Sequence, residues 1–202
     1  MENKINKQIK REKLLDQGVK MLMDQGYHGT GLKEILDEVN IPKGSFYNYF
    51  GSKEMFAAEA IIHYIEPFIE LLNKHLQTPK IDGLTALKNY YAELISDVEK
   101  TGYKGGCLLG NMMGEIGDTS EECRRSLLLT IDRYNKLQES ALLRAQQEGV
   151  VRKDRTVKSM VDLLFSCWQG ALLQMKVEKS VQPLQICWET LLNDYFKEGV
   201  RE

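Results

Sequence analysis

Two short amphipathic segments joined by a tight turn, between Thr30 and Lys53, constrain the fold more than any other part of the chain. In the first segment, apolar residues recur at spacings of three and four, the period of a helix with one buried face. These apolar residues are Leu32, Ile35, Leu36 and Val39. Asn40 follows where the chain must reverse, and asparagine tolerates the positive φ that such a turn requires. The pattern predicts a helix, a turn and a second helix.

The second predicted helix begins near Pro42, because proline lacks an N–H group that would be unpaired at a helix start anyway. Phe46 and Phe50 are four residues apart, so both face the core. The rest of the helix surface is polar or aromatic and comprises Ser45, Tyr47, Asn48 and Tyr49. The second helix of a helix-turn-helix unit lies in the major groove, where hydroxyl and amide groups meet base edges. Lys43 and Lys53 bracket this helix with positive charge for phosphates, so the sequence predicts DNA binding.

Four motifs in this region resemble the DNA-binding domain of TetR-family transcriptional regulators. They are Gly26-Tyr27, Leu32-Lys-Glu-Ile35, Ile41-Pro-Lys-Gly-Ser-Phe-Tyr-Asn-Tyr-Phe50 and Ser52-Lys53-Glu54, within residues 10–56. The resemblance implies that the residues nearest the bases are Lys33, Lys43, Ser45, Tyr47 and Asn48, and that Tyr47, Tyr49 and Lys53 touch phosphates. Gly31 stands where many members carry a serine or threonine cap, so the cap bond and a phosphate contact pass to Thr30 or are lost.

Composition limits how the chain can bind nucleic acid. Among 202 residues, 43% are hydrophobic and 28% charged, which is ordinary for a soluble globular protein. The formal net charge of -2 argues against binding over the whole surface. Positive charge is local instead, because residues 1–13 carry five basic side chains against two acidic ones. We expect this N-terminal arm to favour phosphates or the minor groove.

The sequence predicts a cytoplasmic protein without metal or cofactor. The N-terminus is polar, and no run approaches the roughly 20 apolar residues of a membrane-spanning helix. We therefore expect no membrane partner and four reduced thiols. The cysteines are Cys107, Cys123, Cys167 and Cys187, and their spacing matches no zinc pattern. The three histidines are also scattered along the chain.

The remaining apolar pattern predicts an all-α fold of about nine helices. We expect a helix-turn-helix DNA-binding domain at residues 1–52 and a helical regulatory and dimerisation domain at residues 53–202. Besides the two helices above, the predicted helices cover residues 7–24, 53–76, 84–98, 107–115, 122–148, 154–175 and 184–196. Gly26 should end the first helix, Ser52 and Asp154 should cap two later ones, and Pro67 should kink the fourth.

The last two predicted helices are apolar on more than one face. Such width indicates burial against the body on one side and against a second copy on the other. A homodimer would also suit the palindromic half-sites that helix-turn-helix proteins read. The alternative is that both faces belong to the core of one chain.

A small-molecule inducer would bind in the helical body, because helical bundles commonly enclose ligand cavities. The candidate lining residues are Tyr64, Phe68, Tyr91, Asn111, Met112, Glu115, Trp168 and Gln169. Cys107 is a separate candidate, since it follows Gly105-Gly106 at a predicted helix start. There the helix dipole and nearby Lys104 favour the thiolate form.

The segment Gly-Cys-Leu around Cys107 and the segment from Trp168 to Lys176 resemble a subgroup of TetR-family repressors that sense electrophiles and oxidants. This resemblance implies that Cys107 is the sensor and that the amine of Lys176 can meet it. The sequence thus predicts a repressor released from operator DNA by an electrophile or another small molecule. Three alternatives remain: a non-covalent ligand with Cys107 as a core residue, a small enzyme using Cys107 as nucleophile, or an interaction protein that does not bind DNA. The enzyme would lack both a histidine base and a glycine-rich phosphate loop.

Overall fold

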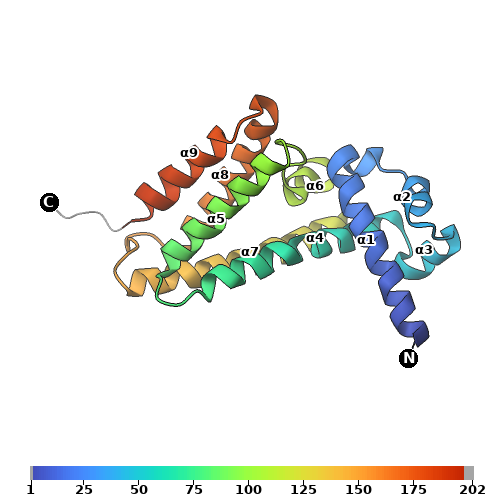
Figure 1. Ribbon diagram of the computed structural model, residues 1–202, viewed down its shortest axis with the longest axis horizontal. Helices are drawn as coiled ribbons and strands as arrows, with labels where there is room; N and C mark the ends of the chain where they lie inside the picture. Colours follow the sequence, from blue (N-terminus) through green and yellow to red (C-terminus); the bar gives the residue numbers. More distant parts are fainter. Residues whose placement is uncertain (1, 198–202) are drawn as a thin grey trace. The chain divides into compact units, whose positions relative to one another are not determined.

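The computed structural model describes residues 2–197, and side chains from residue 6 onward, so Lys4 of the predicted basic arm lies outside the described side chains. Within this range there are nine α-helices, one π-helical segment and no strand beyond an isolated bridge between Val151 and Lys197 (Figure 1). The helices are α1 (Glu2–Gly29), α2 (Leu32–Val39), α3 (Lys43–Phe50), α4 (Lys53–Leu76), α5 (Gly83–Lys100), α6 (Leu108–Ile116), α7 (Glu121–Gln147), α8 (Val157–Glu178), α9 (Gln182–Trp188) and the π-helical η1 (Glu189–Tyr195). The predicted all-α fold is confirmed.

The chain forms two compact units that are not continuous in sequence. The first contains the residues up to Glu66 together with Cys107–Ile131, and therefore holds α1, α2, α3 and α6. The second contains Pro67–Gly106 and the residues from Asp132 onward, with α5, α8 and α9. Helices α4 and α7 contribute residues to both units. The predicted kink at Pro67 falls at the boundary between the units and stays a prediction.

An aromatic cluster forms the core of the first unit. The ring of Phe56 from α4 lies 5.2 Å from that of Phe46 and 4.9 Å from that of Phe50, both of α3. All three side chains are at most 5% exposed. Gly18 of α1 lies directly against Phe56, where a larger residue would overlap the ring. The cluster therefore fixes α3 between α1 and the start of α4.

Buried tyrosines and an amide pack the second unit. Tyr90 and Tyr91 of α5 are at most 1% exposed. The hydroxyl of Tyr90 lies 2.8 Å from that of Tyr134 on α7, and the hydroxyl of Tyr91 donates to Gln138 at 2.7 Å. The indole N–H of Trp188 on α9 donates to the carbonyl oxygen of Lys88. These bonds satisfy polar atoms that would otherwise destabilise the core where α5, α7 and α9 meet.

Two helix starts differ from the sequence predictions. Helix α1 begins at Glu2 rather than near residue 7, so the basic arm is helical. Helix α8 is capped by Thr156, whose hydroxyl accepts the N–H of Ser159, and the prediction of Asp154 as the cap is wrong. Asp154 instead pairs with the guanidinium of Arg152 through two contacts of 2.6 Å, which leaves the next hydroxyl to cap the helix.

Candidate nucleic-acid interface

The turn between α2 and α3 has the geometry that the sequence predicts. Asn40 adopts a left-handed conformation with φ 52° and ψ 47°, and its N–H points to the carbonyl oxygens of Leu36 and Asp37. Pro42 follows as the N-cap of α3, one residue before the helix begins. Because Asn40 reverses the chain and Pro42 fixes the next φ, α3 starts within a few residues of the end of α2.

Helix α3 buries one face and exposes another. Phe46 and Phe50 point into the aromatic cluster, as predicted. Tyr47 is 45% exposed, Lys43 and Asn48 are exposed, and Ser45 and Tyr49 are half-buried. The ammonium of Lys43 lies 6.0 Å from the centre of the Tyr47 ring, and that of Lys7 on α1 lies 5.6 Å from the Tyr49 ring. This face presents amine, amide and phenol groups, which bind phosphates and base edges in protein–DNA complexes.

Thr30 and Lys53, both predicted to contact DNA, take part in internal bonds. Helix α2 starts at Gly31 without a side-chain cap bond. Thr30 is 1% exposed, and its hydroxyl donates to the carbonyl oxygen of Gly26 at 2.6 Å. The side-chain cap bond of α2 is therefore lost and is not made by Thr30 instead. The ammonium of Lys53 donates to the carbonyl oxygen of Tyr27 at 2.6 Å and lies 4.5 Å from its ring centre. Lys33 is exposed on α2.

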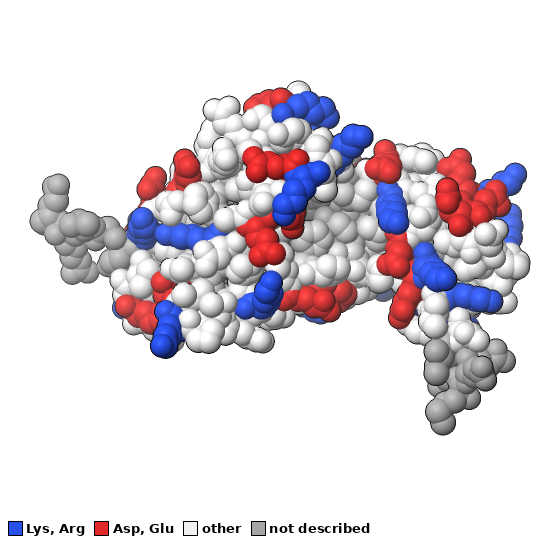
Figure 2. Space-filling model, viewed as in Figure 1, with Lys and Arg blue, Asp and Glu red and all other residues white. Residues whose placement is uncertain are grey.

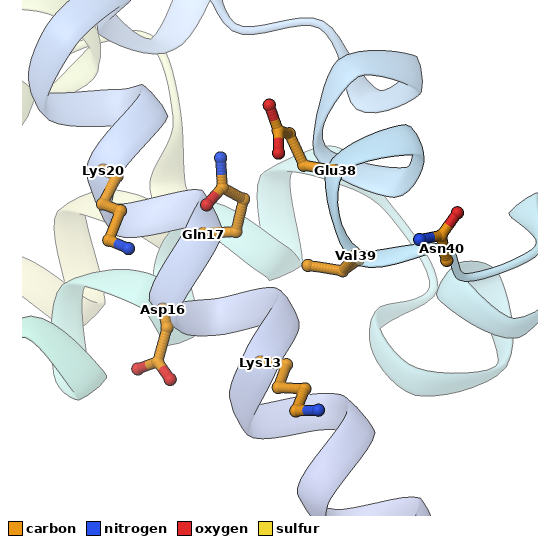
Figure 3. Close-up of a pocket in the computed structure, with 7 residues that line it drawn as sticks. All are labelled: Lys13, Asp16, Gln17, Lys20, Glu38, Val39 and Asn40. Atoms are coloured by element: carbon orange, nitrogen blue, oxygen red, sulfur yellow. The ribbon is translucent and has the colours of Figure 1, made fainter.

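A surface hollow of about 430 Å³ lies between α1 and the end of α2 (Figure 3). Its lining residues are Lys13, Asp16, Gln17, Lys20, Glu38, Val39 and Asn40. The hollow mixes both signs of charge. Lys13 belongs to the basic N-terminal arm, but none of the DNA contacts predicted between Thr30 and Lys53 lines the hollow. Basic and acidic side chains are likewise interspersed over the face drawn in Figure 2, rather than gathered by sign. The character of the predicted interface thus comes from α3 and its flanking lysines.

The second unit brings together one pair of the predicted ligand residues and places Lys176 against Gly106. The rings of Tyr91 and Trp168 are 4.7 Å apart in an edge-on arrangement. A Cβ placed on Gly106 would lie 3.4 Å from the ammonium nitrogen of Lys176, so this amine lies at the residue before Cys107. Phe68 is also in this unit, whereas Tyr64, Asn111 and Met112 are in the first.

The four free cysteines differ in burial. Burial raises the pKa of Cys123, and it raises that of Cys187 to about 12, so both stay protonated near neutral pH. Cys107 is half-buried at the N-cap of α6, and Cys167 is exposed on α8. Cys107 and Cys167 are therefore the thiols that a reagent in solution reaches first.

Two kinds of feature are absent from the described part of the chain. Residues 2–197 contain no cluster of three or more histidine, cysteine, aspartate or glutamate side chains able to hold a metal ion. In the same range, no helix combines the length and apolar character needed to cross a bilayer.

Comparison with known proteins assigns the family. A family model described as bacterial regulatory proteins of the tetR family matches residues 14–60, and one described as the tetracyclin repressor-like C-terminal domain matches residues 83–191. The HTH-type transcriptional repressor DhaR of Mycobacterium sp. (strain GP1) is 30% identical over 90% of this chain and 92% of its own. The HTH-type transcriptional repressor NemR of Escherichia coli (strain K12) is 28% identical over 91% and 92%.

Solved structures agree with this assignment. The reduced form of E. coli NemR superposes with a TM-score of 0.83 at 28% identity, covering 91% of this chain and 95% of that one. A TetR regulatory protein from Rhodobacter sphaeroides gives 0.82 at 27% identity, over 90% and 96%. Matches to both halves of the chain, together with the helix-turn-helix geometry, show that it belongs to the TetR family and is a DNA-binding transcriptional regulator.

Proposed function

We propose that this regulator is a repressor that leaves its operator when an electrophile or oxidant modifies Cys107. The observation that carries the proposal is the position of Lys176, whose amine lies at Gly106, the residue before Cys107 in the sequence. Gly105 and Gly106 have φ values of 81° and 77°, a conformation that other residues rarely adopt. The two glycines lead the chain into α6 with Cys107 at its N-cap.

The chemistry needs only the thiolate and the reagent. The thiolate is the nucleophilic form of a cysteine side chain. The sulfur of Cys107 would attack the β-carbon of an α,β-unsaturated carbonyl compound and form a C–S bond. The electron pair of the C=C bond moves to the α-carbon, which takes a proton from water. One equivalent of reagent is consumed per thiol and nothing turns over, as expected for a sensor and not for an enzyme.

Modification at the N-cap would change the packing of α6 and so favour a conformation that binds DNA poorly. Such a signal can shift the equilibrium only by its differential effect on the two states. For DNA contact we propose the exposed face of α3, with Lys43, Ser45, Tyr47 and Asn48 at base edges. Lys33 on α2 would also lie near the bases, while Tyr47, Tyr49 and Lys53 would bind phosphates. The ammonium of Lys53 has three N–H groups, so it can bind a phosphate and keep its bond to the carbonyl oxygen of Tyr27.

The dimer would form through α8 and α9, whose outer faces carry exposed apolar side chains. On α8 these are Leu163, Leu173 and Val177, with exposed fractions of 38%, 56% and 84%, and Ile186 on α9 is 55% exposed. A strip of this kind on two adjacent helices is suited to an isologous interface. Two copies would place their α3 helices about one turn of DNA apart, roughly 34–36 Å.

A non-covalent inducer is the second candidate. It is favoured by two buried amide atoms of α7 without hydrogen-bond partners, Oδ1 of Asn135 and Nε2 of Gln138, the residue whose oxygen accepts from Tyr91. Such atoms are costly to leave unpaired. A small molecule carrying both an acceptor and a donor could bind them beside Tyr91 and Trp168.

The test is release from a duplex covering the region upstream of the regulator's own gene, at fixed salt, with N-ethylmaleimide as the electrophile and hydrogen peroxide as the oxidant. Wild type should release on treatment, the control Cys167→Ser should release with one equivalent of modification, and Cys107→Ser should stay bound although Cys167 is modified. Lys176→Met should react more slowly. If wild type stays bound with Cys107 fully modified, cysteine sensing is wrong and a non-covalent inducer becomes the leading explanation.

A further inference from the structure

Helix α1 is broken one turn before its end, and a carboxylate from a distant helix holds the broken end. Gly26 has φ 72° and ψ 179°, so the helical hydrogen-bond ladder is interrupted there. The next two N–H groups would lack helical acceptors. The side chain of Glu115, on α6, accepts both of them: the N–H of Tyr27 at 2.7 Å and that of His28 at 2.6 Å.

This contact requires glycine at position 26. A Cβ on Gly26 would lie 2.6 Å from an oxygen of Glu115, closer than nonbonded atoms approach. The positive φ of Gly26 also disfavours any other residue. The sequence therefore provides both halves of one contact, the residue without a side chain on α1 and the carboxylate on α6, almost ninety positions apart.

The held turn leads directly into the helix-turn-helix. Thr30 donates to the carbonyl oxygen of Gly26 through both its N–H and its hydroxyl, and Gly31 then caps α2. On the other side of the turn, the carbonyl oxygen of Tyr27 accepts from Lys53, the first residue of α4. Tyr27 is thus bound by α6 through its N–H and by α4 through its carbonyl group.

We propose that Glu115 is a positioning residue for DNA binding: its carboxylate caps the broken end of α1 and ties the entry of the helix-turn-helix to α6. A bidentate carboxylate defines direction as well as distance. Movement of α6 therefore changes the position of the turn that precedes α2. The proposed role of Glu115 does not depend on Cys107. It applies to the DNA-binding unit for any signal that moves α6.

The electrostatics of the junction agree with this role. Burial lowers the pKa of Lys53, and the carboxylate of Glu115 acts in the opposite direction. Burial raises the pKa of Tyr27, and Glu115 adds to the rise. The negative charge of Glu115 therefore acts on both Lys53 and Tyr27. Loss of that charge would weaken the junction by more than the loss of the two N–H bonds alone.

The experiment compares Glu115→Gln, Glu115→Ala and the control Glu122→Gln, using the full-length chain and the duplex from upstream of its own gene. Glutamine keeps the shape of glutamate but has one oxygen, and its NH₂ group would face the second N–H. We expect Glu115→Gln to weaken binding at least about tenfold, and Glu115→Ala to weaken it more. Glu122 is a half-buried carboxylate in the same unit that pairs with Arg125 on the surface of α7, so Glu122→Gln should bind within about twofold of wild type.

Amide hydrogen exchange distinguishes positioning from a general loss of structure. The amides of Tyr27 and His28 should both lose protection in Glu115→Ala, and one of them should lose it in Glu115→Gln, while the buried residues of α3 keep theirs. Gly26→Ala, which pushes on the same carboxylate from α1, should reproduce the loss of affinity. The proposal is overturned if Glu115→Gln binds like wild type, if the two amides stay protected, or if α3 loses protection equally.

Discussion

A close approach of two backbones in the second unit predicts a large effect of adding one methyl group. Gly83 is the first residue of α5, and a Cβ there would lie 2.7 Å from the carbonyl carbon of Ala141 on α7, and closer still to its oxygen. Carbon atoms pack best at about 3.5 Å or more, so the helices must separate by roughly 1 Å. The obstacle is backbone, which cannot rotate away as a side chain can. Leu84 and Leu87, at most 1% exposed, would lose contacts in the process.

The expected magnitude follows from known effects of overpacking. Gly83→Ala should lower the free energy of unfolding by about 1–3 kcal/mol. The matched control is Gly114→Ala within α6, where a Cβ meets nothing within 4 Å. That change should raise stability by about 0.5–1 kcal/mol, because glycine loses more backbone entropy on folding than alanine.

Urea unfolding and thermal melting measure the two effects. For a chain of this size, the two variants should melt ~3–16 °C apart, with Gly83→Ala below wild type and Gly114→Ala above it. Protein concentration must be fixed, because a dimer's melting temperature depends on it. Equal or greater stability of Gly83→Ala relative to wild type would refute the close packing of α5 on α7.

Three further changes test individual elements. Asp82→Ala removes the cap of α5, which accepts the N–H and hydroxyl of Thr85, and should lower the free energy of unfolding by about 0.5–2 kcal/mol at pH 7. Burial opposes ionisation of Asp82, but the bonds from Thr85 hold the pKa of this carboxyl group below its usual value. The difference in free energy of unfolding between wild type and variant is therefore fully present above the usual pKa of aspartate. It should vanish in urea titrations as the pH falls through the lowered pKa of the folded state. Thr156→Ala should cost about 1 kcal/mol through loss of the α8 cap, measured the same way. Val177→Asp should convert dimer to monomer in sedimentation velocity, whereas Leu129→Asp, on a 64% exposed residue of α7, should leave the dimer intact; a monomer in both cases, or in neither, would contradict the proposed interface.

The helix-turn-helix could be predicted because its determinants are local. Phe46 and Phe50 lie one helical turn apart and share one buried face, and Asn40 has the positive φ that its residue type allows. Short-range rules of this kind need no knowledge of the rest of the chain. The boundaries of α5 and α6 also follow the sequence prediction closely.

The cap of α8 shows where local rules fail. Asp154 and Thr156 are both good caps, and the choice depends on which has another partner. Arg152 pairs with Asp154, and the helix begins after Thr156. The sequence contains both options but not the geometry that decides between them.

Long-range contacts also could not be predicted from the sequence. Glu115 was expected in a ligand pocket, but it holds the end of α1, and no local pattern near either residue predicts a contact across 88 positions. In the sequence, Asn135 and Gln138 cannot be told from other polar residues of α7. Only the structure shows that both side chains are buried and that each has an amide atom without a hydrogen-bond partner. Tyr91 and Trp168 could be grouped as aromatic candidates, because helical bundles bury such side chains, although their contact required the structure.

The measurement that tests the account most directly is the affinity of the full-length protein for DNA from upstream of its own gene and for a scrambled duplex, at several salt concentrations. The account predicts at least about a 10³-fold preference for the upstream DNA. Asn48→Ala should reduce that preference, whereas Lys43→Ala should reduce the dependence on salt. Equal, weak binding to both duplexes, or a preference unchanged by Asn48→Ala, would contradict recognition of the operator through α3.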